Sequence, residues 1–181
     1  DWLADGRLVA VYTRGGLERL ALVADGTADP PDLDLTEFSW VVRAGDGLAA
    51  IAASPTSSEA IVRIDVSSAS VDVLRASREV SVDRRYVSVP RPISFPSHGR
   101  TAHALYYPPT SPDCIGPDDQ RPPLVVMSHG GPTSSTSSSL NLTRQYFTSR
   151  GIAVVDVDYG GSSGYGREYR QLLRGQWGVV D

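Results

Sequence analysis

Two glycine-rich turns, each following a short apolar run, stand out in the second half of the 181-residue chain. The first, His129-Gly130-Gly131-Pro132, comes after Leu124–Met127, and the second, Gly160–Gly166, comes after Ile152–Val157. Glycine lets a backbone come close to a bound molecule because it has no side chain. Ligands of parallel sheets lie off the carboxyl ends of the strands. The two turns are therefore the first candidates for chemistry.

The second turn also contains a serine in a pattern typical of nucleophiles. Gly160-Gly-Ser-Ser-Gly164 formally satisfies G-x-S-x-G, and it follows a strand and precedes a helical stretch. The α/β-hydrolases that use this pattern have the chain order Ser, Asp, His, and no histidine follows His129 here. Ser162 would lack a downstream base, so we do not predict it to be the nucleophile.

The elements around the turns predict a parallel sheet. A helical segment from about Leu140 to Arg150 separates the two apolar runs and ends at Gly151. Two apolar strands flanking one helix are typical of a βαβ unit. Ile93–Tyr107 is interpreted as a hairpin around Ser97–Arg100, Pro108–Pro123 as a surface loop, and Arg167–Leu173 as a short helix.

The first 78 residues have a different pattern. Short strands separated by turn residues are predicted at Arg7–Thr13, Leu17–Ala24, Glu37–Val42, Gly47–Ala53, Glu59–Val66 and Val71–Leu74. On a count of four strands in about 40–50 residues per propeller blade, Leu35–Leu74 makes one blade. Arg7–Ala24 then supplies the last two strands of the blade before it. A small β-sandwich would produce the same pattern.

Composition excludes several classes of function. The net charge is −4, and all 17 basic residues are scattered arginines, which argues against a nucleic-acid partner. No apolar stretch approaches the ~20 residues that span a bilayer, and no signal peptide is visible. The single cysteine, Cys114, is expected to be an inert loop thiol and favours a reducing, cytoplasmic location. No metal-ligand cluster or phosphate-binding loop is seen, so no cofactor is expected.

Three segments together resemble the prolyl oligopeptidase family of serine peptidases, in its acylaminoacyl-peptidase and dipeptidyl aminopeptidase branch. They are Met127–Pro132 (MSHGGP), Val154–Gly166 (VVDVDYGGSSGYG) and Gly175–Asp181 (GQWGVVD). The resemblance is close over Pro92–Asp181 and only architectural before that. It implies a mixed fold: residues 1–78 as the last blades of an all-β propeller, 79–92 as a linker, and 93–181 as the first portion of an α/β-hydrolase domain, truncated before the nucleophile.

The resemblance also implies roles for residues in the two turns. Gly131 would supply a backbone N–H to the oxyanion, supported by His129, Gly130 and Pro132 in the same loop. Tyr165 matches a tyrosine whose hydroxyl is the other oxyanion donor in several members, although packing under the loop would explain it equally. The Ser, Asp and His of the triad would lie outside this chain. His98 and His103 are expected to be structural.

The function implied is cleavage of short peptides by the full-length protein, with the 181-residue chain alone inactive. We expect no cofactor and no nucleic-acid or membrane partner. A homo-oligomer is compatible with the sequence. Two alternatives stay open from the sequence. One is an HGG-type carboxylesterase, which shares the oxyanion loop. The other is a propeller joined to a hydrolase-like domain that has lost its nucleophile and acts as a binding module.

Overall fold

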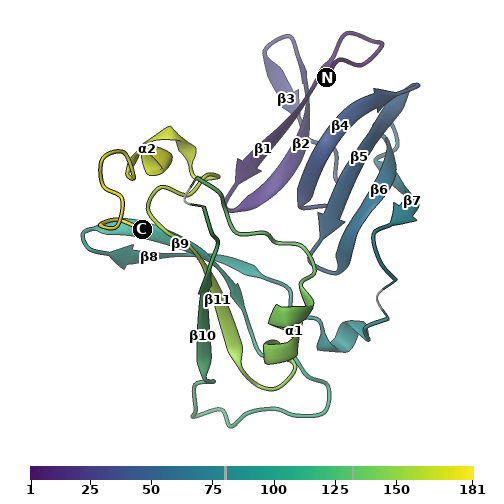
Figure 1. Ribbon diagram of the computed structural model, residues 1–181. Coiled ribbons are helices and arrows are strands. Elements are labelled where there is room, and N and C mark those ends of the chain that lie inside the picture. The colour runs from purple at the N-terminus through teal and green to yellow at the C-terminus, as the bar shows by residue number, and fades with distance from the viewer. Residues whose placement is uncertain (80, 132) are drawn as a thin grey trace.

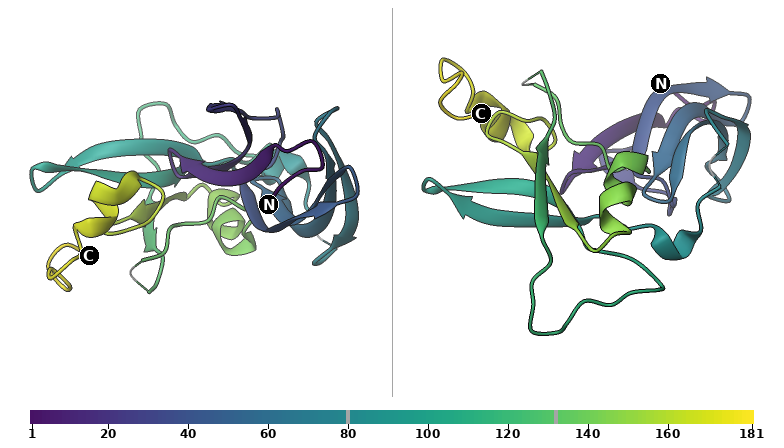
Figure 2. Two further views of the ribbon diagram at one scale, coloured as in Figure 1. Left: turned by 90° about the horizontal axis from the view of Figure 1, so that it is seen from above. Right: turned by 60° about the horizontal axis from the view of Figure 1, so that its bottom comes forward.

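The chain folds mostly into β-sheet. The computed structural model describes residues 1–79, 81–131 and 133–181. Two sheets built from residues 8–76 lie next to each other, and a third, built from residues 91–158, contacts the first of them through Leu17 (Figures 1 and 2). The helices of the described residues are short: η1 (Arg84–Tyr86, 3-10), α1 (Leu142–Thr148) and α2 (Gly166–Gln171).

The first sheet is antiparallel, in the order β1 (Leu8–Arg14), β2 (Leu17–Ala24), β3 (Thr27–Asp29). The hairpin between β1 and β2 turns at Gly15 and Gly16, both with positive φ. The strands β1 and β2 were predicted, whereas β3 was not. Its three residues are all exposed, so no alternation of apolar and polar residues marks it in the sequence.

The second sheet confirms the predicted antiparallel meander. It runs in the order β4 (Glu37–Ala44), β5 (Gly47–Ser54), β6 (Ser57–Asp65), β7 (Ser70–Ala76). Alternation along β6 buries Val62 and Ile64 and exposes Ile61, as the period of two requires. Both sheets share one apolar core, to which Leu20, Leu22 and Leu48 also belong. The described residues form no closed ring of blades.

The third sheet contains the predicted βαβ unit. Its order is β10 (Leu124–Ser128), β11 (Ala153–Asp158), β9 (Arg100–Tyr107), β8 (Arg91–Ser97). The strands β10 and β11 are parallel, with α1 between them in the chain, and β8 and β9 form the predicted hairpin. Strand β8 begins at Arg91, within the stretch 79–92 that was expected to be a linker. Cys114 is exposed in the loop between β9 and β10.

Burial of the two parallel strands differs from the expectation that both are covered on each face. Strand β11 is buried along almost its whole length. Strand β10 is not, because Leu124 is 54% and Val126 66% exposed. The reason is position: β10 pairs with a neighbour on one side only, and α1 packs against β11. Within the described residues, no helix has the length and apolar character needed to cross a membrane.

Candidate functional site

The parallel pairing of β10 and β11 brings the two glycine-rich turns together. Ser128, the last residue of β10, is in register with Val157, so both strands end at the same edge of the sheet. His129–Gly131 and Tyr159–Gly166 leave this edge side by side. Side-chain contacts between His129 and Ser162 link them directly. The structure therefore places the two predicted turns in one site.

Gly131 has a backbone conformation that favours glycine. Its φ is +64°, in the left-handed region, although an added Cβ would meet no atom within 4 Å. The need for glycine is thus conformational and not a matter of space. Gly131 is exposed, so the backbone here is open to a bound molecule. Pro132, the other predicted member of this loop, lies outside the described residues.

His129 is held between the two turns. Its Nε2 lies 2.6 Å from Ser162 Oγ, and its ring stacks on Tyr159 with centroids 4.4 Å apart. The side chain is only 8% exposed. This serine–histidine pair was not predicted, because His129 precedes Ser162 in the chain and the hydrolase order places the base after the serine.

The geometry of the pair is not that of a catalytic triad. In a triad, one imidazole nitrogen faces the serine and the other faces the aspartate. Here the nearest carboxylate, Asp158, lies 3.7 Å from the same Nε2 that contacts Ser162. Ser162 is also completely buried, so its hydroxyl is shielded from a substrate carbonyl. The contact fastens the His129 loop to the second turn.

Asp158 is the buried centre of this region. Its Oδ1 accepts the Thr136 N–H at 2.7 Å, and its Oδ2 accepts the Tyr165 hydroxyl at 2.9 Å. The side chain has no exposed surface. Burial raises the pKa of Asp158, while these two donors and the neighbouring His129 lower it; the net direction is upward. Asp158 was not among the predicted site residues, although an acid that ends an apolar strand before a glycine-rich turn was a signal visible in the sequence.

Tyr165 is half-buried, and its ring and hydroxyl are both in contact with other residues. Its ring stacks on His103, with centroids 4.0 Å apart and planes 4° from parallel. Its hydroxyl donates to Asp158 and also lies against Gly16 of the first sheet, where an added Cβ would be 2.5 Å from the oxygen. Burial is the main cause that raises the pKa of Tyr165, so the phenol keeps its proton. That proton is directed to Asp158 in this structure.

The other two predicted structural histidines lie on the β8–β9 hairpin. His103 Nδ1 contacts Ser94 Oγ at 2.8 Å across the two strands. Burial lowers the pKa of His103, which favours a neutral ring stacked on Tyr165. His98 is at the hairpin tip, with a φ of +48°.

The segment Ser134–Leu140, called the serine strap below, follows the Gly131 loop and crosses from the third sheet to the first two (Figure 1). On one side, its Ser134 carbonyl accepts the Ser163 N–H at 2.8 Å, and its Ser137 carbonyl accepts the Tyr107 hydroxyl at 3.2 Å. On the other side, the Ser138 and Ser139 N–H groups both donate to Glu37. The strap is therefore anchored by both parts of the molecule.

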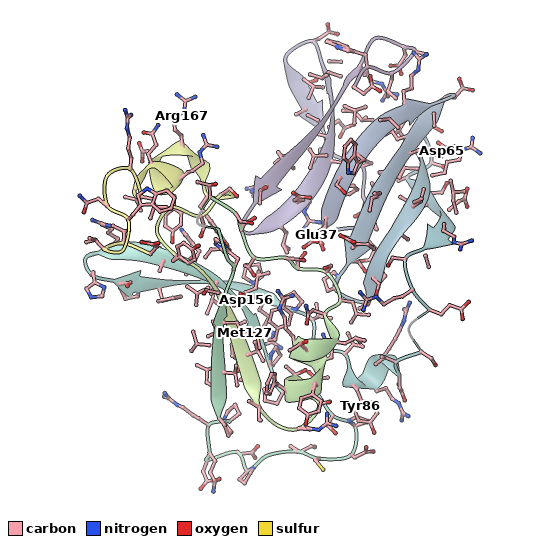
Figure 3. The ribbon with its side chains drawn as sticks, viewed as in Figure 1. Glu37, Asp65, Tyr86, Met127, Asp156 and Arg167 are labelled. Atoms are coloured by element: carbon pink, nitrogen blue, oxygen red, sulfur yellow. The ribbon has the colours of Figure 1, made fainter. Side chains whose placement is uncertain are left out.

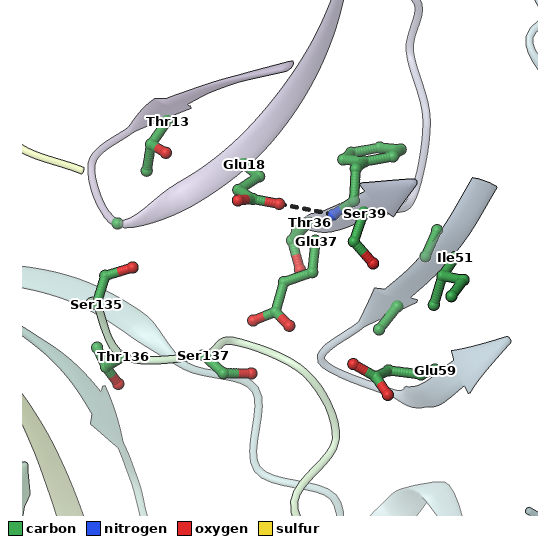
Figure 4. Close-up of a pocket in the computed structure, with 14 residues that line it drawn as sticks. Thr13, Glu18, Thr36, Glu37, Ser39, Ile51, Glu59, Ser135, Thr136 and Ser137 are labelled. Atoms are coloured by element: carbon green, nitrogen blue, oxygen red, sulfur yellow. Dashed lines mark hydrogen bonds between the residues drawn. The ribbon is translucent and has the colours of Figure 1, made fainter. Parts of the chain in front are cut away.

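A cavity of about 250 Å³ lies where the strap meets the first two sheets (Figure 4). Its lining includes Glu18, Glu37 and Glu59, and the Glu18 carboxylate accepts the Phe38 N–H at 2.6 Å. Burial raises the pKa of Glu18, and the nearby Glu37 raises it further. The volume is slightly below the range of about 300–1,000 Å³ usual for small-molecule pockets.

A buried ion pair lies on the strand beside the site. Arg144 of α1 donates to Asp156 of β11 at 2.5 Å, and its guanidinium lies 5.1 Å from the centre of the Tyr107 ring. Figure 3 shows Asp156 near Met127, its register partner on β10. The pair ties α1 to β11. No group of three or more acids, histidines or cysteines in the described part of the chain is arranged to bind a metal.

The fold of this chain is similar to that of known hydrolytic enzymes. A puromycin-hydrolyzing peptidase of Mycobacterium tuberculosis superposes with a TM-score of 0.90 and 38% identity, over 98% of this chain and 28% of that structure. A puromycin hydrolase superposes with a TM-score of 0.86 and 41% identity, over 98% of this chain and 27% of its own.

Sequence comparisons agree with the structures. The family model described as the prolyl oligopeptidase family matches residues 138–181. Dipeptidyl aminopeptidase BIII of Pseudoxanthomonas mexicana is 25% identical over 98% of this chain, and the acylamino-acid-releasing enzyme of Arabidopsis thaliana is 28% identical over 99%. The predicted resemblance to the prolyl oligopeptidase family is confirmed. The chain spans about a quarter of the length of these relatives, 25% and 26%.

Proposed function

We propose that this chain is part of a serine peptidase of the prolyl oligopeptidase family that cleaves short peptides. Residues 1–78 would be the last blades of a propeller, 79–92 a linker, and 93–181 the first portion of an α/β-hydrolase domain. The observation that supports this most is the site itself: the Gly131 loop and the Tyr165 turn adjoin at the carboxyl edge of β10 and β11. The similarity to a puromycin-hydrolyzing peptidase, with 38% identity and a TM-score of 0.90, favours a peptidase over a carboxylesterase.

In the proposed reaction, a serine outside residues 1–181 attacks the peptide carbonyl, and a histidine oriented by an aspartate takes its proton. The carbonyl oxygen becomes negative in the tetrahedral intermediate. The Gly131 N–H would donate to this oxygen, since the backbone at this position is exposed and has the left-handed conformation that glycine favours. Ser162 has no part in this scheme because it is buried and paired with His129.

Tyr165 is the second candidate donor, and its geometry sets a condition on that role. A phenol has one proton to donate, and here it goes to Asp158. To donate to the oxyanion, the Tyr165 hydroxyl would have to break its hydrogen bond to the buried Asp158 carboxylate and form one to the substrate oxygen. We therefore propose the Gly131 N–H as the donor that this chain supplies, with Tyr165 as packing and support beneath the loop.

The test uses the complete protein that contains this chain. We expect it to cleave peptide anilides and to be labelled by a fluorophosphonate at a serine outside residues 1–181. Gly131→Ala should lower kcat by on the order of 10²-fold, because a side chain strains the left-handed backbone and displaces the N–H. A complete protein that neither cleaves nor is labelled would instead fit the inactive binding module.

A further inference from the structure

Asp158 contacts the polypeptide on both sides of Gly131. His129, two residues before Gly131, places its Nε2 3.7 Å from Asp158 Oδ1. Thr136, five residues after Gly131, donates its N–H to the same oxygen at 2.7 Å. One carboxylate oxygen thus meets both ends of the segment that carries the proposed oxyanion donor.

The second oxygen of Asp158 holds the neighbouring turn. Oδ2 accepts the Tyr165 hydroxyl at 2.9 Å, and the Asp158 carbonyl accepts the Tyr169 hydroxyl at 2.6 Å. Asp158 itself belongs to β11, which is paired on both sides, with β10 and β9. The carboxylate therefore projects from an internal strand of the sheet toward both turns.

We propose that Asp158 is a positioning residue that fixes the Gly131 N–H for catalysis, an inference that rests on the proposed peptidase function. It is fully buried, so it does not touch substrate. Its contribution is geometric: its two carboxyl oxygens accept hydrogen bonds from Thr136 after Gly131 and from Tyr165 of the second turn, which fixes the two turns relative to each other. A displacement of about 1 Å at a reacting centre can cost on the order of 10²-fold in rate.

The same strand offers a matched control. Asp156 lies two residues before Asp158 and is also a buried acid with a polar partner, Arg144. Its partner belongs to α1 and not to the Gly131 loop. Replacement of Asp156 removes a buried charge from β11 without removing a contact to the loop. A difference between the two positions therefore separates positioning from general destabilisation.

The experiment compares Asp158→Ala, Asp158→Asn and Asp156→Ala in the complete protein, with folding checked by circular dichroism. We expect Asp158→Ala to lower kcat about 10²-fold with KM within about threefold of wild type. Asp158→Asn, which keeps an acceptor for the Thr136 N–H, should lower kcat only about three- to tenfold. Asp156→Ala should keep kcat within about threefold, although it unfolds at lower temperature.

A second measurement is affinity for a peptide aldehyde, whose adduct with a serine resembles the tetrahedral intermediate. Affinity for the aldehyde should fall in parallel with kcat/KM in the Asp158 variants and not in Asp156→Ala. If Asp158→Ala does not fold, Asp158→Asn carries the test, with an expected loss of about three- to tenfold in both quantities. If the wild type is active and a folded Asp158 variant keeps both kcat and aldehyde affinity unchanged, the positioning role is overturned. An inactive wild type overturns the peptidase function instead.

Discussion

At the scale of single residues, the hydrogen bond between His129 and Ser162 does not by itself make a catalytic pair. Their atoms are 2.6 Å apart, close enough for proton transfer. Function also requires an exposed nucleophile and a carboxylate at the far nitrogen of the imidazole. Ser162 is buried, and Asp158 lies at the near nitrogen. The pair is therefore an attachment between two turns.

Replacement of Ser162 by alanine in the complete protein should leave kcat within a few-fold of wild type. The variant loses one hydrogen bond to His129, which typically contributes about 0.5–1.5 kcal/mol to the free energy of unfolding. Steady-state kinetics and a thermal melt would separate these effects. Loss of activity together with loss of fluorophosphonate labelling would make Ser162 the nucleophile after all.

Tyr165→Phe tests the second candidate donor. Because the hydroxyl proton is directed to Asp158, we expect kcat to fall by less than about tenfold, with KM little changed. Removal of a true oxyanion donor typically costs on the order of 10²–10³ in kcat. A loss of that size would show that the hydroxyl turns from Asp158 to the substrate during the reaction.

The raised pKa of Asp158 predicts a pH effect on stability. The folded protein holds this proton more tightly than the unfolded chain, whose pKa is near 3.8. The stability that this group contributes is therefore fully present below about pH 3.8 and is lost as the pH rises through the folded pKa. Urea unfolding of wild type and Asp158→Asn from about pH 4 to about pH 7 should show the variant gaining stability relative to wild type. A difference that is independent of pH would contradict the assignment.

At the scale of elements, α1 is short and depends on its cap and its tertiary contacts. Asn141 Oδ1 accepts the N–H groups of Thr143 and Arg144, at 2.9 and 3.1 Å. The helix has seven residues, too few to be stable alone. The buried Arg144–Asp156 ion pair joins α1 to β11, the strand that also carries Asp158.

Asn141→Ala should therefore lower the free energy of unfolding by about 1 kcal/mol, within a range of about 0.5–2. Asn141→Asp is the matched control, because it keeps an acceptor at the cap and should be close to neutral. Urea denaturation of the two variants gives the comparison. Equal loss in both would mean that the cap is not the cause.

At the scale of the whole molecule, the serine strap connects the sheets of residues 8–76 with the sheet of residues 91–158. Glu37 accepts two strap N–H groups, and the Leu140 N–H donates to the Ser54 carbonyl at 3.0 Å. Thr36 and Ser138 also pair through their hydroxyls at 2.7 Å. The position of the Gly131 loop thus depends on residues from both parts.

The isolated 181-residue chain should associate. Strand β10 is an edge of its sheet and exposes Leu124 and Val126, and unpaired apolar edges favour pairing between molecules. We expect oligomers or aggregates in light scattering, and no cleavage of peptide anilides. Leu124→Lys/Val126→Lys should reduce association, while Ile115→Lys, at an exposed apolar residue in the loop between β9 and β10, serves as a control. A monodisperse monomer with one cooperative thermal transition would contradict the prediction.

Local patterns in the sequence determined the elements, because hairpins, a βαβ unit and glycine turns depend on residues close together in the chain. The strands β4–β7, the β8–β9 hairpin and the parallel pair β10–β11 were predicted in this way. Contacts across long separations were decided only by the tertiary structure. Three such contacts join residues 22 to 102 positions apart: Asp158 with Thr136, His129 with Ser162, and Glu37 with the strap. No periodicity encodes such pairs, since packing of whole elements selects which polar groups share a buried site.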